Sequence, residues 1–454
     1  MRDAPPLASP TVSEELTPDA PASSKLPLPE GTIPVGVGLV ITGAASYAFF
    51  KVGQQALGKE AFKPVMTLWF VAFTLVPGFF MPVEQELGRS LAHRRAVGEG
   101  GRPVVRRVAT LATALGLAVI AAILVGSPWL TEHMFDHHWS VTVALVAAIT
   151  AYGITAVAKG IASGSARFPA YGALLGIDSA VRIVACIILW LSGVKSVVAY
   201  ALALALSPLF AVAWVRLRGQ MHTEDGPSIE LREVTPNLTW LLLGSLMSAA
   251  LVNAGPLGVD VLASTAQAAK VTAFGNGVIL ARIPLFMFQA IQAALLPRLA
   301  RLAAQGDIAE FRHGFNRLMV VVGGVAVVGT VGAYVAGPTV LDLIYGGGLD
   351  SRTLGLLALS SGMFMLAQSC AQAVIALNGH RMVALGWLSG AVTFVVVTAV
   401  ASHDLYLRVE LGLVTSCTLA FVLLLLAMRS RINAGAIPSA ESMIDGVFDN
   451  PVEG

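Results

Sequence analysis

Apolar blocks about twenty residues long recur along most of this sequence, and each can cross a hydrocarbon core of roughly 30 Å as an α-helix. This recurrence constrains the fold more than any other feature. Of the 454 residues, 56% are hydrophobic and 12% are charged. A soluble globular domain carries charge on roughly a quarter of its residues. The sequence therefore predicts an all-α integral membrane protein.

The apolar windows predict about twelve transmembrane helices, near 33–56, 64–83, 107–128, 139–160, 170–192, 196–215, 237–258, 270–295, 318–341, 353–376, 382–400 and 409–428. The segments between these helices alternate between rich and poor in Lys and Arg. Because cytoplasmic loops carry an excess of these residues, the alternation places both termini in the cytoplasm. We therefore expect a multi-pass protein of the cell (plasma) membrane.

Two segments of the chain share a pattern in which an apolar run passes into a basic, amphipathic stretch that Gly closes. The second predicted helix leads into MPVEQELGRSLAHRRAVGEG (81–100), and the eighth leads into FQAIQAALLPRLARLAAQGD (288–307). Both parent helices carry an interior proline, Pro77 and Pro284. The pattern favours a six-plus-six duplication with a substrate path between the halves. The alternative is that any helix leaving the cytoplasmic face ends in Arg and Gly.

The resulting prediction divides the chain into two lobes, a linker and two tails. The segments are 1–31 (disordered cytoplasmic tail), 32–217 (N-lobe, helices one to six), 218–236 (cytoplasmic linker), 237–431 (C-lobe, helices seven to twelve) and 432–454 (second disordered cytoplasmic tail).

Motifs of enzymes are missing from the sequence, which has no Walker GxxxxGK(S/T), no GxSxG and no HExxH. We therefore expect a transporter rather than an enzyme or an ATP-driven pump, with no cofactor and no nucleic-acid partner. One cluster has metal-like spacing, Glu132-His133-x2-Asp136-His137-His138 in a short outer loop. Such a loop is more often a solvated turn, so we expect no metal site.

Polar and ionisable residues inside the predicted helices are candidates for a substrate-binding cavity, because each ionisable group is costly at mid-membrane. They are Arg282, Arg182, Gln289, Gln292, Gln368, Gln372 and Lys51. Arg282 has no acid one turn away, so its charge needs water, a partner helix or an anionic ligand. Arg182 has Asp178 four residues earlier on the same face, so an internal ion pair is the favoured interpretation and substrate binding is the alternative.

The remaining candidates also have structural alternatives. Two pairs of glutamines each share a helix face, Gln289 with Gln292 and Gln368 with Gln372. We expect their amides to form hydrogen bonds either to sugar hydroxyls or between helices. Lys51 has a stem long enough to reach the outer interface instead.

The chain resembles the multidrug/oligosaccharidyl-lipid/polysaccharide (MOP) exporter superfamily, and within it the actinobacterial polysaccharide-biosynthesis membrane proteins related to O-antigen and lipid II flippases. The resemblance covers about residues 32–431 and rests on the two six-helix lobes and on segments 81–100 and 288–307. It implies a MATE-like fold with a V-shaped cavity between the lobes, which alternates between inward- and outward-facing states. It also implies a flippase that moves an undecaprenyl-diphosphate-linked oligosaccharide for cell-surface polysaccharide biosynthesis. The partners so implied are the lipid bilayer, the lipid-linked glycan and a polysaccharide polymerase or glycosyltransferase.

Two alternatives stay open at this point. A cation-coupled multidrug antiporter of the same superfamily would use an acid in helix one or in the second lobe. Helix one has none, and Asp260 beyond helix seven is the acid that supports this alternative. A non-transporting scaffold of a glycan-synthesis complex would depend on cytoplasmic segments such as 84–106 instead.

Overall fold

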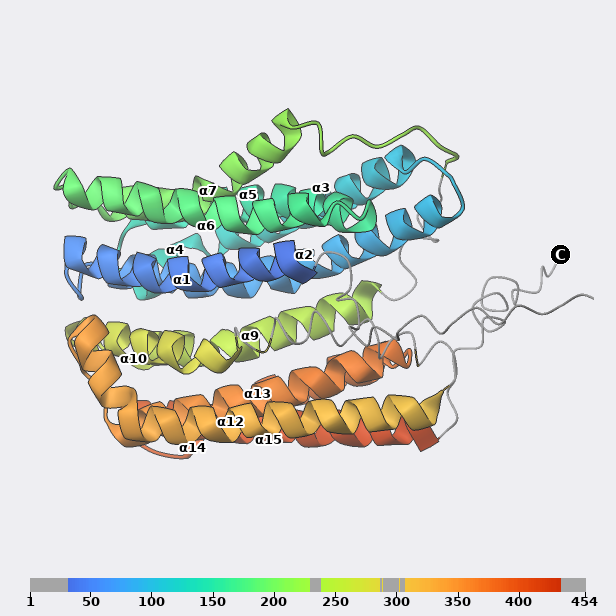
Figure 1. Cartoon of the computed structure of the whole chain (residues 1–454). Coiled ribbons are helices and arrows are strands. Elements are labelled where there is room, and N and C mark those ends of the chain that lie inside the picture. The colour runs from blue at the N-terminus through green and yellow to red at the C-terminus, as the bar shows by residue number, and fades with distance from the viewer. Residues whose placement is uncertain (1–31, 229–237, 286–287, 289–301, 303–306, 434–454) are drawn as a thin grey trace, which may run out of the picture.

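The computed structural model describes residues 32–228, 238–285, 288, 302 and 307–433 (Figure 1). All regular elements within these ranges are helices. Eleven of these helices are long and apolar enough to cross a membrane, judged by length and composition. The prediction of an all-α membrane fold is therefore confirmed.

The first six long helices form the N-lobe. They are α1 (Thr32–Leu57), α2 (Lys63–Ala96), α3 (Arg102–Val125), α5 (Trp139–Gly164), α6 (Phe168–Leu191) and α7 (Val197–Leu217). A short helix α4 (Ser127–Trp129) and a π-helical turn η1 (Leu130–Met134) join α3 to α5. Within this lobe α1 packs along α6, and α5 packs against both α2 and α7.

The second half of the chain forms the C-lobe. It contains α9 (Leu238–Leu262), a 3-10 turn η2 (Thr265–Gln267), α10 (Ala268–Ala281), α12 (Ile308–Tyr345), α13 (Ser351–Ala376), α14 (His380–Val400) and α15 (Leu405–Asn433). Helix α13 packs against α12 and α15, and α14 packs against α15 and α9. The eighth predicted helix, 270–295, is seen as α10, and most of its second half lies outside the described residues.

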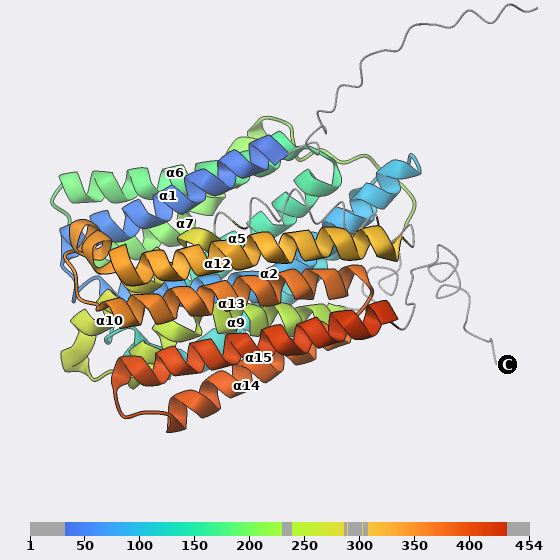
Figure 2. The same ribbon diagram turned by 60° about the horizontal axis from the view of Figure 1, so that its bottom comes forward.

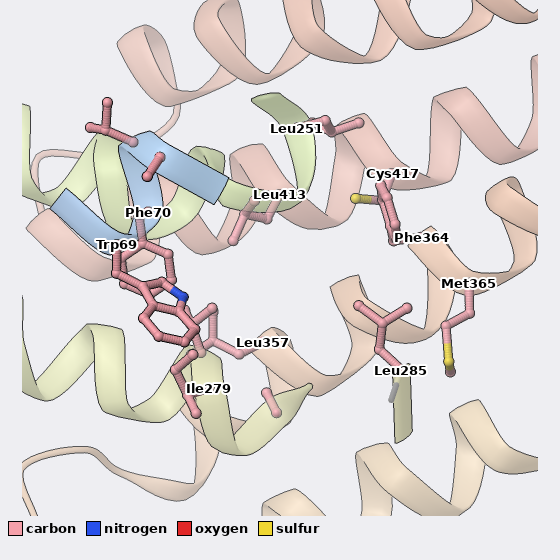
Figure 3. Packing of buried hydrophobic residues seen from close by; sticks show 14 of the residues in the cluster. Trp69, Phe70, Leu251, Ile279, Leu285, Leu357, Phe364, Met365, Leu413 and Cys417 are labelled. Atoms are coloured by element: carbon pink, nitrogen blue, oxygen red, sulfur yellow. The ribbon is translucent and has the colours of Figure 1, made fainter. Parts of the chain in front are cut away.

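The two lobes lie side by side as separate layers of nearly parallel helices, the N-lobe above the C-lobe in Figure 1. Figure 2 shows α12, α13 and α15 of the C-lobe running alongside one another. The lobes meet mainly where α2 packs on α9. One cluster of buried apolar side chains spans this contact, and Figure 3 shows Trp69 and Phe70 of α2 among C-lobe side chains of this cluster, with Ile279 below them and Leu413 to their right.

Small residues allow the helices of a lobe to approach closely, because packing rather than the hydrophobic effect holds helices together in lipid. A Cβ atom on Gly160 of α5 would lie 2.9 Å from Cβ of Leu87, and one on Gly164 would lie 2.6 Å from Cβ of Leu91. Both distances are too short for a real contact. The Gly160-x3-Gly164 pair therefore sets the distance between α5 and α2.

The bundle has two chemically different ends. At one end, here called the linker end, α7 leads into the segment 218–228, which lies against the N-lobe. Arg167 donates to the carbonyls of Gln220 and His222, and Arg102 forms an ion pair with Asp225 at 2.8 Å. The other end, here called the far end, holds the loops 58–62, 263–267 and 346–350.

Candidate functional site

A cavity lies between the two lobes, with about 1450 Å³ of empty space when its open mouth is included. Its walls come from α1 and α2 of the N-lobe and from α9, α10, α13 and α14 of the C-lobe. The polar or aromatic lining residues are Thr42, Ser46, Trp69, Phe73, Gln85, Trp240, Ser245, Ser248, Asn253, Arg282, Phe288, Phe364, Gln368, Gln372, His380 and Trp387.

The cavity extends from the middle of the bundle toward the linker end. On α2 the lining residues run from Trp69 to Gln85, a distance of roughly 24 Å at the helical rise per residue. Gln85 lies in the second half of α2, and Trp240 and His380 lie at the starts of α9 and α14. The positions of Trp240 and His380 belong to the linker end, and Gln85 lies on the linker-end side of the bundle's middle. We call this part of the cavity the mouth, and the part around Arg282 the deep end.

Arg282 is held at the deep end by neutral acceptors. It follows the last residue of α10 and is 8% exposed. Its Nη1 donates to Oδ1 of Asn253 at 3.1 Å, and its Nη2 donates to the carbonyl of Val252. The guanidinium also lies 5.6 Å from the ring centroid of Phe70. Since none of these contacts neutralises it, Arg282 presents a net positive charge to the cavity.

Two prolines explain why acceptors are available for this arrangement. A proline inside a helix has no N–H, so the carbonyl four residues earlier loses its helical partner. Pro256 in α9 frees the carbonyl of Val252, which accepts from Arg282. Pro77 in α2 frees the carbonyl of Phe73, to which Nδ2 of Asn253 donates at 3.0 Å. Asn253 therefore connects the arginine of the C-lobe to the backbone of the N-lobe.

Of the two glutamine pairs predicted from the sequence, one lies among the described residues and the other does not. Gln368 and Gln372 lie on α13 and both line the cavity. Neither makes a hydrogen bond to any residue in the described part of the chain. Gln289 and Gln292 lie outside the described residues. Their place in the cavity stays a prediction.

Arg182 is not part of the cavity lining, although the sequence made it a candidate. It is 1% exposed and pairs with Asp178 of the same helix, its Nη2 lying 3.1 Å from Oδ2. Its guanidinium lies 4.9 Å from the ring centroid of Trp69, and Trp69 stacks on Phe73 at 4.5 Å. Both aromatic residues line the cavity. Arg182 thus lies behind the wall and is neutralised, as its alternative interpretation expected.

Lys51 is also outside the lining. It lies in the last two turns of α1 and donates to the carbonyl of Ile344 on α12. This is a contact between the lobes rather than the snorkelling to the interface that the sequence offered as the alternative. The long stem of the side chain permits either arrangement.

At the far end, polar contacts between the lobes close the space above the cavity. Nζ of Lys63 on α2 forms two ion pairs, one with Oδ1 of Asp260 on α9 at 2.9 Å and one with Oδ1 of Asp136 in its own lobe at 2.7 Å. The amides of Gln54 and Asn276 bond each other reciprocally at 2.7 and 3.0 Å. All of these side chains except that of Asp136 are buried. The cavity is therefore accessible from the linker end and closed at the far end.

Sequence reasoning missed several of these residues. Asp260 was considered, but as an acid for a drug antiporter and not as the partner of Lys63. Asn253 and Asn276 each carry a signal, since a lone amide within an apolar block must find a partner. That signal does not say which partner, because the contact depends on how the lobes pack.

The outer loop with metal-like spacing is used for other contacts. Asp136 bonds Lys63, and the ring of His133 stacks on Trp129 with centroids 5.4 Å apart. Among the described residues no group of three or more His, Cys, Asp or Glu is placed to hold a metal ion.

A two-lobed bundle of transmembrane helices around a cavity that is open at one end defines the class of a membrane transporter. Solved structures share this fold. MATE in complex with MaD3S matches with a TM-score of 0.70 and 16% identity, covering 89% of this chain and 95% of that chain. The inward-facing conformation of a MATE family transporter of the MOP superfamily matches with a TM-score of 0.63 and 16% identity, covering 91% and 97%.

The family is shown by the sequence. The family model described as "Lipid II flippase MurJ" matches residues 79–353, which is more than half of the chain. The chain therefore belongs to the MurJ family of the MOP exporter superfamily and is a membrane flippase or exporter. It is also similar to the uncharacterized proteins Rv3630 of Mycobacterium tuberculosis and Mb3654 of Mycobacterium bovis. Each is 25% identical over 79% of this chain and 83% of the relative.

Proposed function

We propose that this protein moves an undecaprenyl-diphosphate-linked oligosaccharide from the cytoplasmic to the outer leaflet for the synthesis of a cell-surface polysaccharide. The observation that carries the proposal is Arg282, an unneutralised guanidinium at the deep end of a cavity between two lobes. A guanidinium offers paired donors that suit phosphate oxygens. Membership of a lipid II flippase family supports a lipid-linked substrate.

The direction of access follows from the charge distribution of the sequence. The linker end carries most of the basic loop residues, among them Arg94, Arg102 and Arg167. The positive-inside rule favours the cytoplasm for this end, and with it both termini. In that orientation, in the plasma membrane, the mouth faces the leaflet in which lipid-linked glycans are assembled. A polymerase or glycosyltransferase would then act on the glycan at either side of the membrane.

Transport on this proposal proceeds by alternating access around a site near the midplane. The described state takes substrate from the cytoplasm, and opening of the far end would release it outward. That opening requires the bonds from Lys63 to Asp260 and between Gln54 and Asn276 to break, since each joins one lobe to the other. The antiporter alternative loses support because the carboxylate of Asp260 already forms an ion pair with Lys63 and accepts a hydrogen bond from Thr67.

The test is a flipping assay with purified protein in vesicles, using a fluorescent short-chain polyprenyl diphosphate that carries a glycan. We expect Arg282→Gln to slow flipping at least about tenfold, because one charge-assisted hydrogen bond contributes about 1.5–3 kcal/mol. Arg282→Lys keeps the charge without the paired donors and should be intermediate. Arg317→Gln is the matched control, since Arg317 is exposed on α12 and forms no ion pair with a described residue. Normal flipping by Arg282→Gln would remove this residue from the mechanism.

A cellular measurement tests the substrate itself. Depletion of the protein should cause undecaprenyl-linked glycans to accumulate on the cytoplasmic side, as seen by mass spectrometry of lipid extracts. An unchanged lipid pool with increased drug sensitivity would instead support the multidrug antiporter. Export that survives the Arg282 variant but fails when 84–106 is altered would support the scaffold.

A further inference from the structure

The mouth of the cavity differs from the deep end in its chemistry. Of the described residues that line the cavity, Arg282 is the one with a permanent charge, and it lies at the deep end. The mouth holds amide, aromatic and imidazole side chains. These are Gln85, Trp240, Gln368, Gln372 and His380.

The polar groups of the mouth have unused hydrogen-bonding capacity. The amides of Gln85, Gln368 and Gln372 make no hydrogen bond to a described residue. Nδ1 of His380 is buried and also has no partner among the described residues. A polar group removed from water without a partner costs about 1–3 kcal/mol. This cost applies to Nδ1 of His380, whereas the three amides are accessible to solvent in the open cavity and can exchange water for a polar ligand.

These groups face one another across the mouth. Gln368 and Gln372 are four residues apart and so lie on one face of α13. Gln85 comes from α2 in the other lobe, and Trp240 comes from the start of α9. Along α9, Trp240 lies roughly 20 Å from Asn253, which holds the arginine. A ligand that reached both ends would place one chemical group at Arg282 and a different one at the mouth.

We propose that the mouth is a binding subsite for an uncharged saccharide ring, the glycan residue next to the phosphate that Arg282 holds. This inference rests on the proposed function. Amide side chains donate and accept at once and so suit vicinal hydroxyls, and the electron-rich face of an indole packs on the C–H face of a sugar ring. The guanidinium of Arg381 lies 5.7 Å from the ring centroid of Trp240, so a cation is close to the mouth, although it is not among the residues that line it.

The subsite fixes the orientation of the substrate in the cavity. The phosphate occupies the deep end, and the sugar extends toward the cytoplasm. Gln368 and Gln372 then act as specificity-determining residues that distinguish a glycan-bearing lipid phosphate from a bare one. Gln85 adds a contact from the N-lobe, so that a bound sugar touches both lobes.

The experiment compares two probes, farnesyl diphosphate and farnesyl-diphospho-N-acetylglucosamine, by calorimetry on the purified full chain in detergent. We expect wild type to bind the sugar-bearing probe about tenfold more tightly, the effect of two ordinary hydrogen bonds. The double variant Gln368→Leu with Gln372→Leu should lose this preference and keep its affinity for farnesyl diphosphate. Gln55→Leu is the matched control, because Gln55 is exposed at the far end of α1. It should behave as wild type.

Each outcome separates the subsite from the proposed function. Equal binding of both probes by wild type would overturn the subsite and leave the phosphate site intact. Binding of neither probe would overturn both. Arg282→Gln should weaken both probes by the same factor. If the double variant does not fold, Gln85→Leu alone should reduce the sugar preference, and an unreduced preference in a folded Gln85→Leu protein counts against the subsite.

Discussion

Two buried arginines of this protein, Arg182 and Arg282, differ in what surrounds them, and this difference decides their roles. Arg182 is neutralised by Asp178 at 3.1 Å. Arg282 is bonded by an amide and a carbonyl, which stabilise its charge without cancelling it. A charged side chain at mid-membrane costs a few kcal/mol, so a cation that is not neutralised there indicates a ligand or a functional constraint. Arg282 is accordingly the residue that can attract an anion.

The first prediction concerns the neutralised pair. Asp178→Asn leaves Arg182 buried without a counter-charge, and we expect the protein to lose about 3–5 kcal/mol of stability. Thermal unfolding in detergent measures this as a lower Tm. Glu86→Gln breaks the more exposed pair with Arg89 and should cost less than about 1 kcal/mol. Equal melting of the two variants would contradict the structural role of the buried pair.

The sequence indicated the partner of Arg182 but not that of Arg282. The pair with Asp178 follows from helical spacing alone, because residues four apart share a face. The contact of Arg282 with Asn253 joins residues 29 apart on different helices and depends on tertiary packing. The same holds for Trp69, which separates Arg182 from the cavity. A residue in an apolar block can thus be identified as unusual before its partner can be named.

At the scale of elements, prolines inside the long helices leave backbone carbonyls without their helical partners, and side chains of the site donate to these carbonyls. Pro77 frees the carbonyl of Phe73 for Asn253, and Pro256 frees that of Val252 for Arg282. Such carbonyls are tolerated in a membrane only where another group satisfies them. The freed carbonyls therefore accept hydrogen bonds from the site, and no helical hydrogen bond has to break for this.

The second prediction tests this use of a proline. In Pro77→Ala the new N–H bonds the carbonyl of Phe73 and competes with Asn253. We expect flipping to slow severalfold while Tm stays the same or rises, because a helical hydrogen bond is gained. Pro338→Ala in α12 is the control, since no described side chain donates to the carbonyl of Tyr334 that it frees. Equal flipping by both variants and wild type would show that the freed carbonyl of Phe73 is dispensable.

The sequence predicted about twelve spans, of which the described residues contain eleven, and it predicted their order and type but underestimated the lengths of some of them. Helix α2 continues to Ala96, whereas the apolar window ends at 83, and α12 spans Ile308–Tyr345 instead of 318–341. The windows end where basic residues begin. Backbone hydrogen bonding continues past that point because an amphipathic stretch stays helical when one face packs on the protein. The start of a basic stretch therefore does not mark the end of a helix.

At the scale of the whole molecule, the charge contacts of the far end hold the lobes together while the mouth is open. Lys63 bonds acids of both lobes, Asp260 in the C-lobe and Asp136 in the N-lobe. When the far end opens, the bond to Asp260 must break and the bond to Asp136 can persist. The two-lobe arrangement was predictable from the sequence. The closed end was not, because hydropathy does not depend on which end of the cavity is open.

The third prediction separates these two acids. Asp260→Asn removes the charged acceptor between the lobes, which contributes about 1.5–3 kcal/mol, so the population open at the far end should rise roughly tenfold or more. Asp136→Asn weakens a bond within one lobe and should leave this population unchanged. Thr272→Cys provides the probe, because Thr272 is fully buried at the far end, where its hydroxyl donates to the carbonyl of Lys59 in the other lobe at 2.8 Å, and a water-soluble thiol reagent reaches it when that end opens.

The native cysteines do not interfere with this measurement, since Cys186, Cys370 and Cys417 are all buried. We expect labelling of Thr272→Cys to be faster with Asp260→Asn than with Asp136→Asn or with neither change, and the bond that this cysteine removes is missing from all three proteins alike. Equal rates in both carboxylate variants would mean that Lys63 does not control opening through Asp260. The amide pair of Gln54 and Asn276 would then be the contact that holds the far end closed, and Gln54→Leu should increase labelling on its own.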